Sequence, residues 1–227
     1  MTPPLVVFDL DGTLVHTAPD LISSLNHTIA SVGLEPVSYE DVTFLVGNGA
    51  KVMIERAFAL REKPLSAEEH EILLDRFIEH YSANMPGESQ PYPGLVNALD
   101  RLKAAGFSLA VCTNKLEELA LPLIEGLGLT HYFATITGGD TFAARKPDPA
   151  HLLGTVELAK ADPRRTVMIG DSVNDIMVAR NADIPSIAVP FGYSDVAIET
   201  LGATRIIGHF DELTPALIEE LLQREIA

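Results

Sequence analysis

Two aspartates, Asp9 and Asp11, follow directly after the apolar run Leu5-Val6-Val7-Phe8. Because every residue of that run is apolar, it predicts a strand buried on both faces, as in a parallel sheet covered by helices. Ligands of open α/β sheets bind where the strands end. Two carboxylates at this spacing could share a divalent cation, or could divide into a nucleophile and a general acid. The alternative is a plain turn, because Asp-Gly is a common turn dipeptide.

A second acidic segment repeats this pattern later in the chain. Asp171 and Asp175 follow the apolar run Val167-Met168-Ile169, and Gly170 and Ser172 flank Asp171. Asp171 could complete a magnesium site with the first pair, because Mg²⁺ prefers oxygen ligands and keeps several waters. The alternative is a helix N-terminus capped by Ser172 or Asp171, where the helix dipole favours acids.

Two further segments offer groups that could hold phosphate. Thr113 and Asn114 follow the predicted strand 108–112, and Lys146 precedes Pro147, which biases it toward an extended conformation. A hydroxyl, a carboxamide and an ammonium group can all donate to phosphoryl oxygens, although each could also be an ordinary turn or surface residue. The four segments occur in order, each after a predicted strand. Together they would supply a nucleophile, a proton donor, phosphate ligands and a metal site.

The elements that would position these residues form two groups. Residues 17–90 carry helical patterns throughout, and residues 86–94 are the clearest linker. After residue 93, helices alternate with short strands, which predicts a βαβ series with right-handed crossovers. We therefore expect an α/β protein with a doubly wound, Rossmann-like parallel sheet as its core (residues 1–16 and 91–227). An α-helical cap (residues 17–90) is inserted after the first strand.

Capping residues predict where the helices of the insertion begin. Asp20 is expected to cap a first helix, and Ser38-x-x-Asp41 has the form of a capping box with Asp in place of Glu. Ser66 and Glu69 provide the full Ser-x-x-Glu pattern for a later helix.

Composition limits the partners of this chain. Its 227 residues carry a net charge of −16, from 16 Lys+Arg against 32 Asp+Glu, which disfavours nucleic acid and anionic membranes. No apolar run approaches the ~20 residues of a membrane span, and the start has no signal-peptide pattern. The single cysteine, Cys112, excludes an intrachain disulfide and lies in an apolar run, as a structural thiol would. We expect a cytoplasmic protein, monomeric or homodimeric.

The motifs resemble those of a known family. Four segments are similar to the four motifs of the haloacid dehalogenase superfamily: Asp9-Leu10-Asp11-Gly12-Thr13, Thr113-Asn114, Lys146-Pro147 and Gly170-Asp171-Ser172-x-x-Asp175. The helical insertion resembles the type-one cap of that superfamily. Three more resemble the phosphoglycolate phosphatases within it: Ala18-Pro19-Asp20-Leu21, Val46-Gly47-Asn48-Gly49-Ala50 and Gly138-Gly139-Asp140. His16 departs from the family pattern, where an acid is usual, and is expected at a hinge or rim.

The resemblance implies a Mg²⁺-dependent phosphomonoester hydrolase that works through an aspartyl-phosphate. Its substrate would be a small phosphorylated metabolite, 2-phosphoglycolate first among them. Asp9 would be the nucleophile, and Asp11 would protonate the leaving group and then activate water. Thr113, Asn114 and Lys146 would hold the phosphoryl oxygens.

The resemblance also implies ligands for the metal and for the leaving group. Mg²⁺ would be held by the carboxylates of Asp9 and Asp171 and by the backbone carbonyl of Asp11. Asp175 would bind a metal-bound water or orient Lys146. The cap would select the leaving group, and three residues are candidates for recognising a substrate carboxylate: Asn48, Lys51 and Lys115.

Other activities fit part of this pattern. A phosphatase for a sugar phosphate or nucleotide, or a mutase similar to β-phosphoglucomutase, would share both motifs and cap. A dehalogenase would lack the acid at Asp11 and the full metal site with Asp171. A protein that binds a phosphorylated ligand without catalysis is disfavoured, because every catalytic position is filled.

Overall fold

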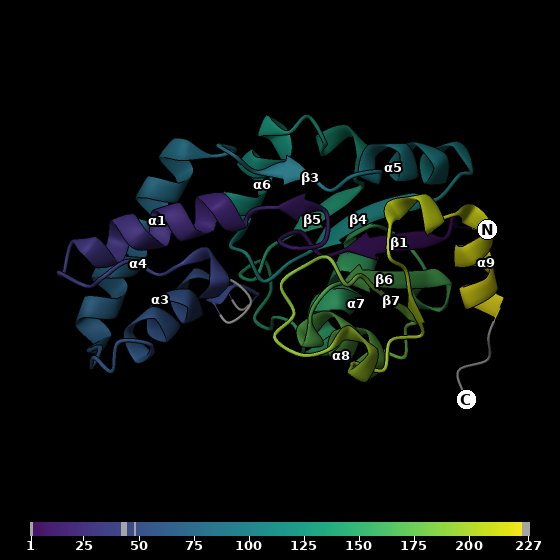
Figure 1. Ribbon diagram of the computed structural model, residues 1–227. Coiled ribbons are helices and arrows are strands. Elements are labelled where there is room, and N and C mark those ends of the chain that lie inside the picture. The colour runs from purple at the N-terminus through teal and green to yellow at the C-terminus, as the bar shows by residue number, and fades with distance from the viewer. Residues whose placement is uncertain (1, 42–44, 48, 224–227) are drawn as a thin grey trace.

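The computed structural model describes residues 2–41, 45–47 and 49–223. A six-stranded sheet forms the centre of the molecule, and every pairing within it is parallel (Figure 1). Its strands, in order across the sheet, are β5 (Thr135–Thr137), β4 (Ser108–Cys112), β1 (Leu5–Phe8), β6 (Thr166–Gly170), β7 (Ser186–Ala188) and β8 (Arg205–Ile206). The chain thus winds outward from β1 in one direction and then from β6 in the other. This order confirms the predicted doubly wound, Rossmann-like core.

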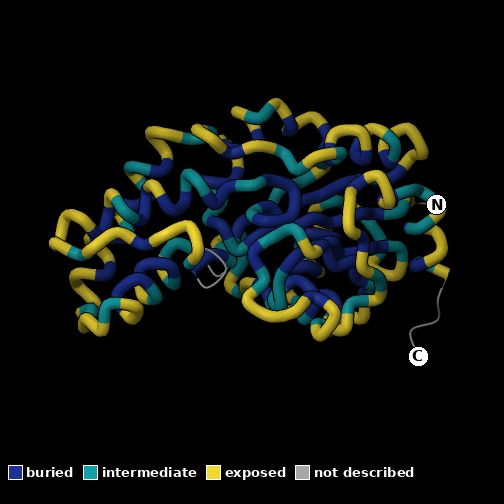
Figure 2. The backbone as a smooth tube through the Cα atoms, viewed as in Figure 1, coloured by how far each residue is buried: buried dark blue, intermediate teal, exposed yellow. Residues whose placement is uncertain are grey.

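Both faces of the sheet are covered by helices, as the apolar first strand predicts. The flanking helices are α5 (Leu95–Ala104), α6 (Glu117–Gly126), α7 (Pro149–Leu158), α8 (Val173–Asn181) and α9 (Pro215–Gln223). Val6 and Phe8 pack into a cluster with α5, α6 and α9, whereas Leu5 and Val7 pack into another with α7 and α8. Alternate side chains of β1 therefore enter opposite cores, and the strand is buried throughout (Figure 2).

The insertion after β1 is a helical layer with a core of its own. It contains α1 (Ala18–Ala30), the short 3₁₀ helix η1 (Tyr39–Asp41), α3 (Ala50–Ala59) and α4 (Ala67–Asn84). Buried side chains such as Leu25, Ile54 and Phe77 join these helices. The expected capping box of α4 is present, since Ser66 Oγ accepts from the Glu69 backbone N–H and Glu69 accepts from the Ser66 backbone N–H. We call α1, η1, α3 and α4 the cap.

Two short strands connect the cap to the core. β2 (Val15–His16) and β3 (Gln90–Pro91) pair antiparallel, so the chain enters and leaves the cap side by side. The prediction that Asp20 caps a helix beginning at Leu21 is wrong, because α1 begins at Ala18. The Asp20 carboxylate instead accepts hydrogen bonds from the backbone N–H groups of Glu88 and Ser89. Asp20 therefore ties the start of the cap to the segment that follows its last helix.

Among residues 2–41, 45–47 and 49–223, no helix combines the length and the apolar character needed to span a bilayer.

Candidate active site

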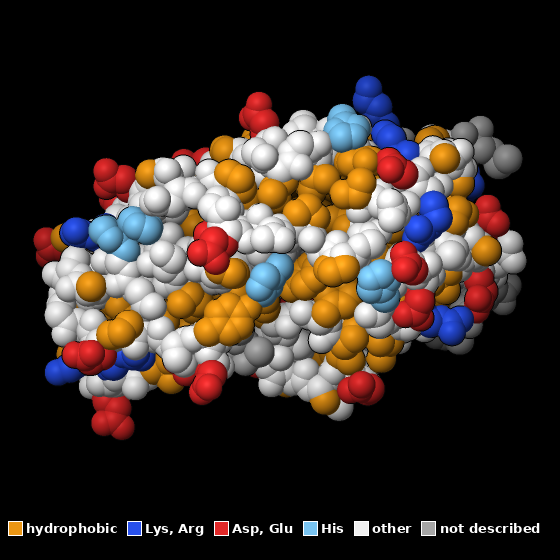
Figure 3. All heavy atoms as spheres, turned by 45° about the horizontal axis from the view of Figure 1, so that its top comes forward, with side chains coloured by type: hydrophobic (Ala, Val, Ile, Leu, Met, Phe, Trp, Pro, Cys, Tyr) orange, Lys and Arg blue, Asp and Glu red, His pale blue; other side chains and the backbone are white. Residues whose placement is uncertain are grey.

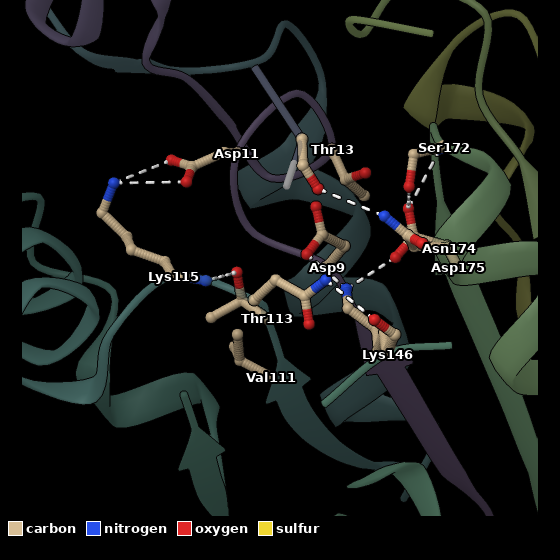
Figure 4. Close-up of polar contacts among 12 residues, drawn as sticks. Asp9, Asp11, Thr13, Val111, Thr113, Lys115, Lys146, Ser172, Asn174 and Asp175 are labelled. Carbon is tan, nitrogen blue, oxygen red and sulfur yellow. Dashed lines mark hydrogen bonds and ion pairs between the residues drawn. The ribbon is translucent and has the colours of Figure 1, made fainter. Parts of the chain in front are cut away.

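The predicted acidic residues meet at the point where the strand order reverses. Asp9 and Asp11 follow β1, and Asp171 follows its neighbour β6, so the two acidic segments lie at adjacent strand ends. Brought in from the loop before α7, Lys146 places its Nζ 2.6 Å from Asp9 Oδ1 and 2.6 Å from Asp175 Oδ1 (Figure 4). One buried ammonium group thus orients two carboxylates.

Three carboxylates form a cluster that could hold a metal ion. One oxygen each from Asp9, Asp171 and Asp175 lies within 4.8 Å of the others, and all three residues are buried. This set includes the side chain of Asp175. The metal ligands predicted from the sequence were instead the carboxylates of Asp9 and Asp171 and the backbone carbonyl of Asp11, with Asp175 binding a metal-bound water or orienting Lys146. Both arrangements supply the oxygen ligands that hard divalent cations take.

Asp171 is held in one orientation by its surroundings. Thr13 Oγ1 donates to its Oδ1 at 2.7 Å, and the backbone N–H of Tyr193 donates to its Oδ2 at 2.7 Å. A Cβ added at Gly12 would lie 2.5 Å from Asp171 Oδ2, and one added at Gly192 would lie 2.2 Å from the same atom. Gly12 also has a φ of +89°, which glycine adopts readily. Both glycines are therefore required by the placement of this carboxylate.

The electrostatics of the cluster favour a bound cation. Burial, followed by the charge of Asp175, raises the pKa of Asp171 to about 7. Burial also raises the pKa of Asp9 well above its usual range, despite the opposing effect of Lys146. For Lys146, burial acts to lower the pKa, but Asp175 and Asp9 outweigh it and the pKa is raised. The carboxylates are thus short of positive charge, which a divalent cation would supply.

Thr113 and Asn114 stand at the end of β4, on the wall of a small cavity above Asp9. Thr113 is buried, and its Oγ1 accepts from the backbone N–H of Lys115 at 3.2 Å. Asn114 Nδ2 donates to the Lys146 carbonyl at 3.1 Å, so its carboxamide holds the loop that carries the lysine. Its Oδ1 is buried and has no hydrogen-bond partner among the described residues.

Lys115 lies between the core and the cap. Its Nζ is 3.2 Å from both carboxylate oxygens of Asp11 (Figure 4). The same Nζ lies 4.3 Å from the centre of the Tyr81 ring, which α4 contributes. Burial alone would lower the pKa of Lys115, but Asp11 and Tyr81 outweigh it and raise the pKa. Lys115 is therefore a buried, charged group that pairs with the acid two residues after Asp9.

The cavity beside Lys115 lies between the core and the cap. It has a volume of about 40 Å³, room for a few water molecules. Core residues Asp9, Asp11 and Lys115 line one side, and cap residues Met53 and Phe77 line the other.

The structure describes one of the other two candidates for substrate recognition. Lys51 is exposed on α3, pairs with Glu71 at 2.6 Å and does not line the cavity. Asn48 lies outside the described residues, although its neighbours Gly47 and Gly49 line the cavity. Of the two candidates that the structure describes, Lys115 and Lys51, it is Lys115 that contacts an aspartate of the site, Asp11.

Sequence reasoning missed three residues of the site. Thr13 lies within the first motif, and only its contact with Asp171 shows its role. Tyr193 lies in a loop after β7 with no distinguishing pattern, and Tyr81 reads as one apolar position among several on α4. Only the fold brings the Thr13 hydroxyl and the Tyr193 N–H to Asp171 and the Tyr81 ring to Lys115, so no local spacing could have indicated these contacts.

The fold and the site define a class of α/β proteins with paired aspartates at the switch point of a parallel sheet, beneath a helical cap. Within that class, the chain belongs to the haloacid dehalogenase-like hydrolases, whose family pattern matches residues 6–189. The family named from the motifs is thereby confirmed.

Individual relatives cover nearly the whole chain. A phosphoglycolate phosphatase of Agrobacterium fabrum is 61% identical over 224 residues, which are 99% of this chain and 96% of the relative. The crystal structure of a predicted phosphoglycolate phosphatase from Haemophilus somnus superposes with a TM-score of 0.87 at 32% identity, covering 94% of this chain and 97% of the other. CbbY from Rhodobacter sphaeroides, solved in complex with phosphate, gives a TM-score of 0.82 at 26% identity, covering 96% and 100%.

Proposed function

We propose that this protein is a phosphomonoester hydrolase that converts 2-phosphoglycolate to glycolate and phosphate. The relatives named phosphoglycolate phosphatase support the activity. The observation that carries the choice of substrate is Lys115, a buried ammonium group in a small cavity beside Asp9 and Asp11. It would pair with the carboxylate of a short ester whose phosphoryl group reaches Asp9.

The chemistry follows from the placement of each side chain. Asp9 attacks phosphorus and becomes an aspartyl-phosphate, and its orientation for attack is fixed by Lys146. Asp11 gives its proton to the departing glycolate oxygen and later takes one from the water that hydrolyses the intermediate. Lys146 and Thr113 hold the phosphoryl oxygens, while Asn114 fixes the Lys146 loop.

The metal of this site would be Mg²⁺, held by Asp9 and Asp171 with Asp175 close by. The donor set fits, because all candidate ligands are oxygens and the cluster lacks positive charge. When bound, Mg²⁺ would neutralise the repulsion between Asp9 and a dianionic ester. Thr13 and the Tyr193 backbone N–H keep Asp171 turned toward the cluster.

Lys115 would make the site prefer substrates that carry a carboxylate. In the structure, its ammonium group pairs with Asp11. A substrate carboxylate would take over this ammonium group and release Asp11 to act on the leaving oxygen. An ester without a carboxylate would leave Asp11 engaged. Preference for 2-phosphoglycolate would then be expressed in turnover as well as in binding.

The boundaries of the moving part follow from the connecting strands. Residues 17–90 would move as one cap about β2 and β3, while residues 1–16 and 91–227 hold the phosphoryl group. Cap movement would admit substrate and then exclude water from the reaction.

A matched pair of esters tests the proposed substrate. 2-Phosphoglycolate and 2-hydroxyethyl phosphate have similar size and an unactivated leaving group, but only the first carries a carboxylate. We expect kcat/KM at saturating Mg²⁺ to be at least about 30-fold higher for 2-phosphoglycolate, because loss of a buried charge pair costs about 2–5 kcal/mol. Equal values for the two esters would overturn the substrate assignment.

Variants of two lysines show whether Lys115 is the source of this preference. Lys115→Met should bring the two kcat/KM values within a few-fold of each other. Lys51→Met removes a lysine from the cap surface, away from the cavity, and should keep the native ratio. Phosphoglucose isomers would be assayed alongside: isomerised sugar without released phosphate would identify a mutase instead.

A further inference from the structure

His16 stands at the centre of a hydrogen-bonded group that spans the cap and the core. Its Nδ1 is 2.9 Å from the hydroxyl of Tyr193, and its Nε2 is 3.0 Å from the hydroxyl of Tyr39 in the cap. The backbone N–H of Ala18, the first residue of α1, donates to the Tyr193 hydroxyl at 3.0 Å. His16 itself lies on β2, one of the two strands that connect cap and core.

These contacts place both ring nitrogens of His16 within hydrogen-bond distance of a tyrosine hydroxyl. The Tyr193 hydroxyl accepts from the Ala18 N–H and keeps one proton to donate, and His16 Nδ1 lies 2.9 Å away. His16 Nε2 lies 3.0 Å from the Tyr39 hydroxyl, so the ring bridges Tyr193 and Tyr39 in either neutral tautomer. Burial lowers the pKa of His16, in agreement with a neutral ring.

The same tyrosine touches the acidic cluster through its backbone. The N–H of Tyr193 donates to Asp171 Oδ2 at 2.7 Å, and a Cβ at Gly12 would come within 2.9 Å of the Tyr193 ring. Tyr193 is 5% exposed, so its ring has little freedom to move independently of either contact. Tyr193 thus contacts the first turn of the cap through its hydroxyl and the proposed metal ligand Asp171 through its backbone N–H.

We infer that Tyr193, oriented by His16, is a positioning residue that couples closure of the cap to metal binding at Asp171. With the cap closed, Ala18 engages the hydroxyl and the Tyr193 N–H holds Asp171 toward the cluster. With the cap displaced, the loop of Tyr193 loses its anchor on α1, and Asp171 loses a donor that fixes its orientation. The inference rests on the proposed role of Asp171 as a metal ligand.

Coupling of this kind acts equally in both directions. Closure should strengthen Mg²⁺ binding, and Mg²⁺ without any substrate should favour the closed cap. The second effect can be observed in the absence of turnover, because the amides of α1 will exchange more slowly with solvent when the cap is held closed.

The experiment uses the full-length protein, with Mg²⁺ as the sole ligand. Mg²⁺ affinity is measured by calorimetry, and amide hydrogen exchange over residues 18–30 is measured with and without Mg²⁺. Tyr193→Phe keeps the ring and removes the hydroxyl. We expect it to weaken Mg²⁺ binding at least about 5-fold, the lower end of typical coupling between sites, and to abolish the Mg²⁺-dependent slowing of exchange. His16→Phe should change both quantities in the same direction and by less.

Tyr92→Phe is the matched control. The Tyr92 hydroxyl donates to the Phe191 carbonyl at 3.2 Å, lies 3.5 Å from His16 and adjoins the Tyr193 hydroxyl, but among the described residues it has no hydrogen bond to α1 or Asp171. Its removal should leave Mg²⁺ affinity and the exchange response within twofold of the native values. A purely structural role of Tyr193 would destabilise the metal-free protein while leaving the response to Mg²⁺ intact, and this result would overturn the inference.

Asp171→Asn separates this inference from the function it rests on. If Asp171→Asn leaves Mg²⁺ affinity unchanged, the proposed metal site is wrong and the coupling falls with it. If Asp171→Asn abolishes binding but Tyr193→Phe binds Mg²⁺ as the native protein does, only the coupling is wrong.

Discussion

At the scale of single residues, Asp171 shows how the site is prepared for a cation. Folding raises its pKa from the ordinary 3.8 to about 7, chiefly through burial. Between these values the folded protein binds a proton at Asp171 that the unfolded chain does not. The contribution of Asp171 to the free energy of unfolding therefore falls as pH rises through this window, by at most about 1.4 kcal/mol per pH unit.

This fall in the free energy of unfolding with rising pH gives a prediction for the metal-free protein. From pH 4 to 7 in chelator, the native protein should lose stability relative to Asp171→Asn, whose amide does not titrate. Mg²⁺ should reverse the trend, because it competes with the proton and binds more tightly as pH rises. Denaturant unfolding of both proteins across this range measures the difference. Parallel pH profiles for native and variant protein would contradict the altered pKa.

Asp11 gives a second prediction at this scale. Asp11→Asn should lower turnover of 2-phosphoglycolate by about 10²–10⁴-fold, the usual contribution of general acid catalysis. The loss should be much smaller for nitrophenyl phosphate, whose leaving group needs no proton. Steady-state kinetics with both esters provides the test. An equal loss for both would assign Asp11 to metal binding or structure.

At the scale of elements, the sequence indicates strands and helices where hydrophobic pattern and capping agree. β1 and β4 occupy the ranges expected from their apolar residues, and Ser66 caps the start of α4 as its capping box predicts. The two-residue strands β2 and β3 escaped notice because a pair of residues has no periodicity. The error at Asp20 has a similar origin, since its partners lie almost 70 residues further along the chain.

The residues of the site likewise divide into those that short motifs reveal and those that only tertiary packing brings together. Asp9, Asp11, Lys146 and Asp171 lie in short motifs and could be named from their spacing. The contact of Lys115 with Asp11 crosses 104 residues, and its cap partner Tyr81 depends on how α4 docks. Such contacts arise from tertiary packing, which local patterns do not encode.

The loop after β7 offers a prediction at the element scale. Gly192 has no positive φ, so alanine suits its backbone, but the added Cβ would lie 2.2 Å from Asp171 Oδ2. Gly192→Ala should therefore displace Asp171 and weaken Mg²⁺ binding about 10-fold or more. Gly208→Ala is the control, because its Cβ would meet nothing closer than 3.5 Å. Calorimetric titration with Mg²⁺ compares them, and equal affinities would show that Asp171 adjusts without loss.

At the scale of the whole molecule, charge opposes the proposed substrate. The chain has a net charge of −16, whereas 2-phosphoglycolate is an anion. On the face shown in Figure 3, hydrophobic side chains gather along the middle, and Lys and Arg lie mainly toward the two ends. Attraction for the substrate must therefore come from buried groups such as Lys115 and Lys146 and from the metal, since the overall field repels it.

Ionic strength should reveal this arrangement. Raising salt from 0.01 to 0.15 M shortens the screening length from about 30 to about 8 Å and so weakens long-range repulsion more than contacts in the buried site. At saturating Mg²⁺, we expect kcat/KM for 2-phosphoglycolate to rise a few-fold over this range. A steady fall with salt would indicate a positively charged approach to the site.

The central claim is that Asp9 accepts the phosphoryl group of 2-phosphoglycolate. Its most direct test is to mix enzyme, Mg²⁺ and 2-phosphoglycolate, quench within milliseconds, reduce with borohydride and locate the modified residue by peptide mass spectrometry. An acyl phosphate on Asp9 would be reduced, converting that residue to homoserine, and the account predicts this change at Asp9 and at no other carboxylate. Conversion at another residue, or phosphate release in the same time course with Asp9 unmodified, would contradict it.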